Sequence, residues 1–228
     1  AVKVQDDLVV ELPLAEAEGH KILVDAAERE MELKPHLRKI YRDVPRPSLK
    51  DQQPDWDRLR NALGDRSYRI SHSALQALPG VLREKKFSCT AVAAGNEVTG
   101  VEAGDTTGRM FGMAFDIGTT TVVGYLMDLL TGKQLGVASR MNPQTKYGAD
   151  VISRITYVGQ EAGGLERLQK AIIEAMNRII EEAVGDAGYV REDVYAVSVV
   201  GNSCMHHLFL GLDPKHIALA PYVPVTGS

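Results

Sequence analysis

Cysteine is scarce in this sequence: its 228 residues contain only Cys89 and Cys204, and no Cys-x-x-Cys pair. Neither an iron–sulfur cluster nor a four-thiolate zinc site can be built from these two thiols alone. Both cysteines have apolar neighbours, which favours buried, free thiols. Such usage is typical of a reducing compartment, so we expect a cytoplasmic protein.

The sequence also lacks a long hydrophobic run, a signal-peptide pattern and an excess of positive charge. No apolar segment approaches the roughly 18 residues of a membrane-spanning helix, so we expect no membrane partner. Lys and Arg number 26 against 30 Asp and Glu, and this formal net charge of -4 argues against a nucleic-acid partner. Hydrophobic residues make up 44% and charged residues 25%, which is typical of one large or two small globular domains.

The chain divides into three regions by its local pattern. Residues 1–31 are interpreted as a linker, with a short extended piece at 8–12 and a helix from about 16 to 30. Residues 32–108 are interpreted as a small α+β middle domain. Residues 109–228 are interpreted as the first half of a nucleotide-binding domain.

In the middle region, turn residues and periodicity predict two helices followed by a β-hairpin. Asp55 is a suitable N-cap for the first helix, and Gly64 is a suitable stop. Ser73 can cap the second helix, and Gly95-Asn96 suits a two-residue hairpin turn. The expected elements are a strand at 37–44, helices at 55–63 and 74–78, and strands at 87–93 and 97–102. No catalytic set stands out in this region.

The third region predicts a mixed α/β fold. Apolar residues between Leu165 and Ala183 recur at spacings of three and four, which indicates one buried helix stripe. The expected elements are strands at 110–116, 120–128 and 134–141, a helix at 148–158, a longer helix after 163–164, a buried strand at 194–200 and a helix at 203–210. This order matches a ribonuclease-H-like half-domain, apart from the doubled helix.

A tight turn after the first of these strands is the main candidate for chemistry. Gly118 lets the backbone bend and approach a phosphate oxygen, and the amides of Gly118 to Thr121 can form an anion-binding nest. Thr119 and Thr120 add hydroxyl donors. Asp116 cannot usefully touch a phosphate, but its carboxylate can hold Mg²⁺ or its waters. No Gly-Lys-Ser/Thr follows, so the turn is not a Walker P-loop.

Further polar residues follow the third strand. Gln144 and Lys146 lie in a loop, where their side chains either face the nucleotide cleft or are simply solvated. Asp150 and Arg154 share one helix face. They form either a surface ion pair or a site in which Asp150 orients a metal ion or a water near the cleft.

Residues 201–203 follow the expected buried strand. Ser203 can cap the next helix, and that amino end can also receive an anion or a partner group. His206 and His207 are adjacent on this helix and point about 100° apart, so structural or interface roles are favoured over metal ligation.

Four stretches carry a family resemblance: FDIGTTT at 115–121, NPQTKYGADVISR at 142–154, VGNSCMHHL at 200–208 and APYVP at 220–224. With the first, the chain resembles the ASKHA superfamily of acetate and sugar kinases, Hsp70 and actin. With the others, it resembles the ATP-dependent reductive activators of corrinoid proteins and their uncharacterised relatives.

The resemblance implies a function in electron transfer. Such activators use ATP and Mg²⁺ to drive one electron from a 2Fe–2S cluster onto the Co(II) corrinoid of a partner protein. Catalytic roles then fall on Asp116 and Asp150, with Mg²⁺ on Asp116. Cofactor binding falls on Gly118, Thr119, Thr120, Thr121, Gln144, Gly201 and Asn202.

The sequence departs from the whole-family pattern in two ways. The cluster's cysteines are absent, and no second phosphate hairpin or adenosine pocket follows the first. We therefore expect a fragment that binds ATP poorly or not at all by itself and is inactive alone, with the 2Fe–2S cluster only in the full-length protein. A small-molecule kinase of the ASKHA fold and an actin- or FtsA-like assembly protein stay open as alternatives, as does a homodimer.

Overall fold

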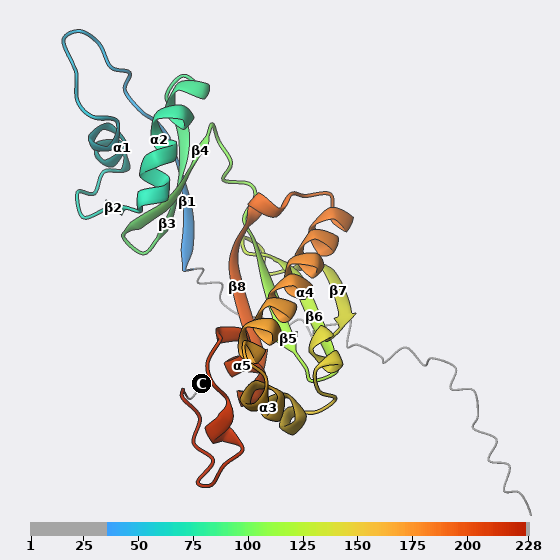
Figure 1. The fold of residues 1–228 in the computed structure, drawn as a ribbon. Coiled ribbons are helices and arrows are strands. Elements are labelled where there is room, and N and C mark those ends of the chain that lie inside the picture. Colours follow the sequence, from blue (N-terminus) through green and yellow to red (C-terminus); the bar gives the residue numbers. More distant parts are fainter. Residues whose placement is uncertain (1–35, 227–228) are drawn as a thin grey trace, which may run out of the picture. The chain divides into compact units, whose positions relative to one another are not determined.

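The computed structural model describes residues 36–226, which belong to one compact unit of the chain, Met31–Ser228. These residues form two four-stranded sheets, each accompanied by helices (Figure 1). The expected linker at 1–31, with its strand at 8–12 and helix at 16–30, lies outside the described residues, as does the start of the expected middle domain at 32.

The first sheet has the strand order β1-β3-β4-β2. The strands β1, β3 and β4 are antiparallel, whereas the short β2 runs parallel to β4. Gly95, in the expected hairpin turn between β3 and β4, has a φ of 57°, which suits glycine. The elements are β1 (Leu37–Asp43), α1 (Asp55–Leu63), β2 (Arg69–Ile70), α2 (His72–Glu84), β3 (Ser88–Ala94) and β4 (Glu97–Ala103).

Helix α1 has the expected bounds but a different N-cap. It ends at Gly64, whose φ of 81° gives the left-handed C-cap that the sequence predicts. Its N-cap is Pro54, without a side-chain cap, and Asp55 is the first helical residue. The expectation that Asp55 caps the helix was wrong. In the first turn, its negative charge still suits the positive end of the helix dipole.

Helix α2 is longer than its sequence suggests. Ser71, not Ser73, is its N-cap, because the Ser71 hydroxyl accepts a hydrogen bond from the Ala74 N–H at 3.2 Å. The helix continues through Pro79 to Glu84, although a proline removes one intrahelical hydrogen bond. Burial of the apolar side chains on both sides of Pro79, Leu78 and Leu82, favours the continued helix.

The second sheet has the strand order β7-β6-β5-β8. Its first three strands are antiparallel, and β8 runs parallel to β5. The strands are β5 (Phe111–Ile117), β6 (Thr121–Asp128), β7 (Gln134–Met141) and β8 (Val194–Gly201). Each lies within a residue or so of its expected position, because the apolar alternation and the turn residues fix the boundaries locally.

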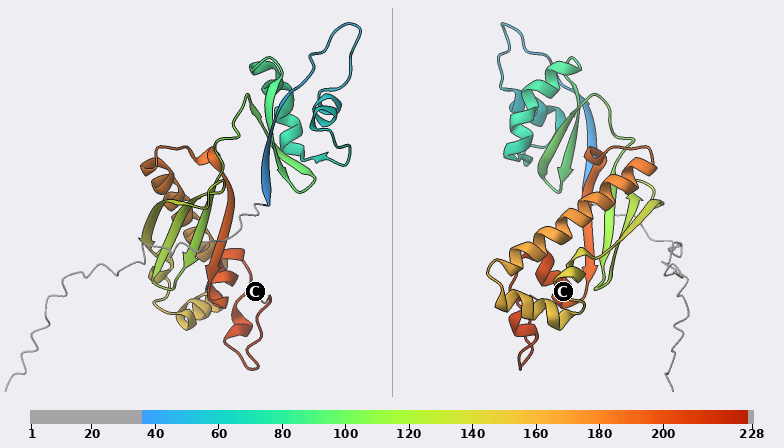
Figure 2. Two further views of the ribbon diagram at one scale, coloured as in Figure 1. Left: turned by 180° about the vertical axis from the view of Figure 1, so that it is seen from behind. Right: turned by 45° about the vertical axis from the view of Figure 1, so that its right-hand side comes forward.

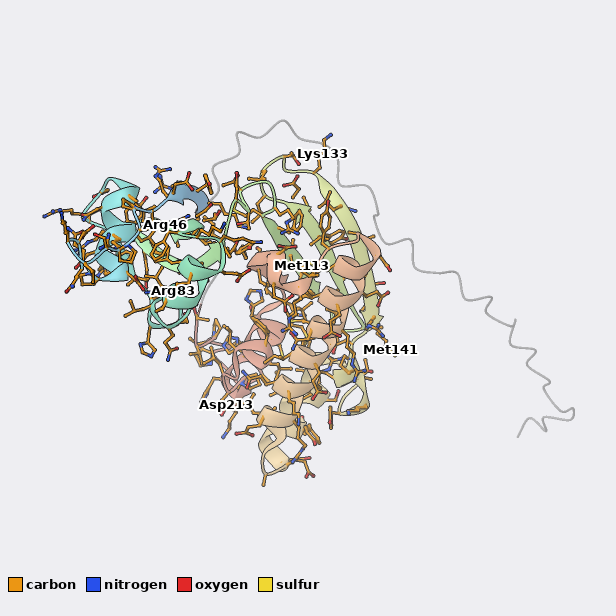
Figure 3. All side chains as sticks on the ribbon, turned by 90° about the horizontal axis from the view of Figure 1, so that it is seen from above. Arg46, Arg83, Met113, Lys133, Met141 and Asp213 are labelled. Carbon is orange, nitrogen blue, oxygen red and sulfur yellow. The ribbon has the colours of Figure 1, made fainter. Side chains whose placement is uncertain are left out.

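Helices cover one face of this sheet. They are α4 (Gly164–Asp186) and α5 (Ser203–Leu210), and α3 (Val151–Gln160) packs against these two helices. The 3₁₀ turns are η1 (Pro143–Lys146), η2 (Arg191–Asp193) and η3 (Lys215–Ile217). The long α4 crosses β6 and β7 (Figure 1) and buries Leu168, Ile172 and Ile179 completely. Met113 lies inside this core, whereas Lys133 and Met141 lie on the outside (Figure 3).

The opposite face of the second sheet carries no helix among residues 36–226 (Figure 2, left). Strand β8 differs from its expected burial: Val197 is 52% and Val200 58% exposed. The strand is apolar, but it lies at the sheet edge and has one neighbour only, which leaves these side chains uncovered. Within the described residues, no helix has the length and apolar character needed to cross a membrane.

Candidate phosphate-binding site

The turn between β5 and β6 is closed by its own backbone. The N–H of Gly118 donates to the carbonyl oxygen of Thr121 at 2.9 Å. A Cβ at Gly118 would stand 2.7 Å from that oxygen, closer than real Cβ atoms come. Glycine is therefore required here by the close approach of two backbone segments.

The remaining carbonyls of the turn are held by side chains and backbone behind it. Asn142 binds two of them: its Nδ2 donates to the Gly118 oxygen at 2.8 Å and its N–H to the Thr120 oxygen at 2.7 Å. The Arg154 guanidinium donates to the Thr119 oxygen at 2.5 Å. All four carbonyl oxygens from Gly118 to Thr121 thus accept a hydrogen bond within the protein.

The same arrangement leaves two backbone donors free. The N–H groups of Thr119 and Thr120 donate to no atom of the described residues. In a trans peptide, the carbonyl of one residue and the N–H of the next point in opposite directions. These two N–H groups therefore point away from Asn142 and Arg154, as in an anion-binding nest. The expected nest of Gly118 to Thr121 is smaller than predicted, because the Gly118 N–H closes the turn.

Asp116 lies at the carboxyl end of β5, one residue before the end of the strand, with its side chain exposed. Its carboxylate has no hydrogen-bond or ion-pair partner among residues 36–226. No three His, Cys, Asp or Glu of these residues come together to hold a metal ion. A single carboxylate still suits Mg²⁺, which keeps several waters and takes its other ligands from substrate phosphates.

Gly201 and Asn202 bring the start of α5 next to the turn. Gly201 ends β8 opposite Ile117, and a Cβ at Gly201 would stand 3.0 Å from the Ile117 oxygen. Asn202 caps α5, because its Oδ1 accepts from the Met205 N–H at 3.0 Å, and its Nδ2 donates to the Thr119 hydroxyl oxygen at 3.5 Å. The expected cap, Ser203, is the first helical residue instead.

Gln144 does not face a cleft. Its side chain is 1% exposed; its Nε2 donates to the Leu168 oxygen at 3.0 Å and its Oε1 accepts from Arg154 at 3.3 Å. Both the nitrogen and the oxygen of its side-chain amide are thus hydrogen-bonded within the protein. The expectation that Gln144 contacts the cofactor directly was therefore wrong. Lys146 lies over the ring of Tyr147, 4.7 Å from its centroid.

Asp150 and Arg154 do not form a surface ion pair. Asp150 is the N-cap of α3 in a capping box with Ser153, whose N–H donates to Oδ1 at 2.7 Å. This hydrogen bond holds the pKa of Asp150 below its usual value. Arg154 is fully buried and turned inward.

Asn142 and Arg154 are the functional residues that sequence reasoning missed. They are the first and last residues of the stretch 142–154, which carries the family resemblance. Their place in this stretch was the only sign in the sequence that they could matter. Their partners in the turn are 24 and 35 residues away in sequence, so local patterns could not reveal the contacts.

His207 has a structural role, as expected for adjacent histidines on a helix. It is 1% exposed, its Nδ1–H donates to the Ser203 oxygen at 2.6 Å, and its Nε2 accepts from the Val225 N–H at 2.9 Å. Both ring nitrogens are therefore occupied and not available to a metal ion.

Comparison with known proteins agrees with this geometry. The profile of the RACo middle region matches residues 111–228, and that of the RACo linker region matches residues 26–108. The corrinoid activation enzyme RamQ of Eubacterium limosum is 46% identical over 114 residues, which are 50% of this chain and 19% of RamQ.

A solved structure, the reductive activator for corrinoid, iron–sulfur protein, superposes with a TM-score of 0.72 at 36% identity. The match covers 87% of this chain and 33% of that protein. The chain thus spans a fifth or less of RamQ and a third of the solved activator. Together with the strand order, this match confirms the α/β fold class with a ribonuclease-H-like half-domain. Because the RACo middle-region profile covers half of its residues, the chain belongs to the RACo family.

Proposed function

We propose that this chain is part of an ATP-dependent reductive activator of a corrinoid protein. In this proposal, residues 109–228, most of which match the RACo middle region, form the first half of the ATP-binding domain. Residues 32–108, which lie within the match to the RACo linker region, form a small α+β domain before it, and residues 1–31 a linker. The observation that carries the proposal is the turn 118–121, with all carbonyls held from behind and two backbone donors free. The names of the two relatives support the corrinoid partner.

In this proposal, the free N–H groups of Thr119 and Thr120 bind phosphate oxygens, together with the hydroxyl groups of the turn. Asp116 holds Mg²⁺ directly or through water, and the bound ion neutralises phosphate charge. Because Gly118 and Gly201 have no side chain, the backbone at each can approach a neighbouring backbone segment closely. Asn202 orients the Thr119 hydroxyl. Asp150 uses only its Oδ1 in the capping box, so its Oδ2 stays a candidate for orienting water.

The electron donor lies outside these residues in our proposal. Cys89 and Cys204 are both buried and free, and the chain has no other cysteine. A 2Fe–2S cluster held by other residues would supply the one electron that takes the partner's Co(II) to Co(I), and the residues of this chain would hold only the nucleotide. Nucleotide binding can bias this step only if it changes the contacts between the two proteins.

The family assignment favours this function over the two alternatives from the sequence. A small-molecule kinase needs a carboxylate that positions the substrate hydroxyl. No carboxylate of residues 36–226 forms a hydrogen bond or an ion pair with residues 118–121, whose side-chain partners are Asn142, Arg154 and Asn202. An assembly protein needs a self-complementary surface, for which the described residues give no specific observation.

Asp116→Ala tests the proposal in the longer protein that carries this chain together with its electron donor. We expect ATP-dependent reduction of a Co(II) corrinoid protein, followed by its absorbance, to slow by about a hundredfold because the Mg²⁺ ligand is lost. Asp186→Ala is the matched control, since Asp186 is an exposed carboxylate at the far end of α4. Unchanged activity in Asp116→Ala would refute the magnesium role. Wild-type reduction that needs no ATP would refute the function.

A further inference from the structure

Arg154 is the largest fully buried side chain of the described residues, with 0% of it exposed. From α3 its guanidinium reaches three separate segments. Nε donates to the Gly148 oxygen at 2.9 Å, Nη1 to the Gln144 Oε1 at 3.3 Å, and Nη2 to the Thr119 oxygen at 2.5 Å. Nη1 also lies 3.2 Å from the Met205 sulfur of α5. One side chain thus joins the turn, the loop after β7, and α5.

None of these partners is negatively charged. Asp150, one helical turn away, raises the pKa of Arg154, but its carboxylate is engaged in the α3 cap and forms no ion pair with the guanidinium. Burial is the main influence and lowers the pKa of Arg154, yet an arginine stays charged in proteins. A buried charge without an opposite partner is costly, typically by several kcal/mol.

Arg58 is a second buried arginine with which Arg154 can be compared. It is 2% exposed, and its Nη1 lies 2.7 Å from the Asp51 carboxylate. The positive charge of Arg58 is compensated within the protein, whereas that of Arg154 is not. This difference in charge compensation indicates that the uncompensated charge of Arg154 has a role in the turn.

The peptide between Thr119 and Thr120 connects this charge to the free donors. Its carbonyl accepts from Arg154, and its N–H, which points in the opposite direction, is the free Thr120 N–H. A charge behind the carbonyl polarises the peptide and makes its N–H a stronger donor. A phosphate in front of the turn would therefore be attracted by the N–H and by the charge behind it.

We propose that Arg154 is a positioning residue of the phosphate turn, which holds the Thr119 carbonyl inward and supplies a buried positive charge that a bound phosphate compensates. This inference rests on the proposed function, because it requires that the turn binds phosphate. A lysine keeps the charge but lacks the planar fork that reaches Gly148, Gln144 and Thr119 at once. Methionine removes both the charge and the hydrogen bonds.

The test is a titration with magnesium ATP of the longer protein that carries this chain, ¹⁵N-labelled at threonine and followed by the amide resonances of Thr119 and Thr120. NMR detects weak binding, and the resonances of the folded turn differ from those of unfolded molecules, so a loss of stability is not mistaken for a loss of affinity. We expect the wild-type resonances to shift. We expect Arg154→Met to bind at least about tenfold more weakly, since a hydrogen bond to a charged group is lost. The affinity of Arg154→Lys for magnesium ATP should lie between those of the wild type and Arg154→Met.

Arg58→Lys is the matched control, and its titration should equal that of the wild type. If Arg154→Met does not fold, Arg154→Lys carries the test by itself, and its affinity must be below that of the wild type. Wild-type affinity in folded Arg154→Met, or in Arg154→Lys, would overturn the inference while leaving the proposed function intact. If the turn resonances of the wild-type longer protein do not shift, the proposed function is overturned instead.

Discussion

At the scale of single residues, burial sets the chemistry of both cysteines. Cys89 is 0% and Cys204 2% exposed, and burial raises the pKa of each thiol to about 11 from an ordinary 9.0. Desolvation disfavours the thiolate, which is the reactive form. Both groups therefore behave as small apolar side chains.

We predict that neither thiol reacts with iodoacetamide at neutral pH until the chain unfolds. Ser203→Cys, an exposed neighbour of Cys204, is the control that should be alkylated rapidly in the folded chain. Stability should also fall as pH rises from 9.0 to about 11, because the unfolded state loses these protons first. The double variant with alanine at both positions should lose less over this range. Rapid alkylation of the folded wild type would contradict the prediction.

The residues of the candidate site differ in how far the sequence reveals them. Asp116 and Thr120, which are exposed, and Thr119 and Thr121, which are half-buried, follow from the spacing of one short stretch and from the chemistry of phosphate binding. Gln144 was expected to face the cleft or the solvent because it is polar and lies in the loop after the third strand. Its burial depends on the Leu168 carbonyl of α4, a contact 24 residues away that no local pattern contains.

At the scale of elements, Gly118 and Gly80 differ in whether the structure has room for a side chain. A Cβ at Gly118 meets the Thr121 oxygen at 2.7 Å, so the turn must open to accept it. A Cβ at Gly80 meets nothing within 4 Å, and Gly80 lies in the interior of α2. The first glycine is needed for geometry, and the second only adds flexibility to a helix.

We predict that Gly118→Ala lowers the free energy of unfolding by about 1–3 kcal/mol through overpacking. Gly80→Ala should raise it by about 0.5–1 kcal/mol, because alanine has the better helix propensity. Urea unfolding monitored by circular dichroism measures both. A stabilised Gly118→Ala would show that the turn has room for a side chain, against the geometry described above.

Elements with their own periodicity could be predicted, and those that depend on distant partners could not. The stripe on α4 and the alternation in β5 to β7 are local and were found. The two-residue β2 exists because it pairs with β4, some thirty residues away in the chain. The end of α2 at Glu84 reflects packing of Leu82 in the core, which outweighs the proline signal.

At the scale of the whole molecule, the described residues contain two hydrophobic clusters with no member in common. One lies in the first sheet and its two helices and includes Leu59. The other lies between the second sheet and α3 to α5 and includes Ile172. Composition alone allowed one large or two small domains, and the sequence pattern placed the change between 108 and 109. The partition of the apolar residues into two clusters could be confirmed only in three dimensions.

Separate clusters predict separate responses to core mutations. Leu59 and Ile172 are both 0% exposed, and truncating either to alanine should cost about 2–5 kcal/mol. Leu59→Ala should speed hydrogen–deuterium exchange in residues 36–108 and leave residues 111–226 unchanged, while Ile172→Ala should do the reverse, because each cluster stabilises only its own sheet. Mass spectrometry of peptides resolves the two regions, and each variant is the other's control. If either variant speeds exchange equally in both regions, the two clusters unfold as one cooperative unit. A local response would mean that the phosphate turn can keep its geometry while the first sheet opens, so nucleotide binding need not report on the state of the first region.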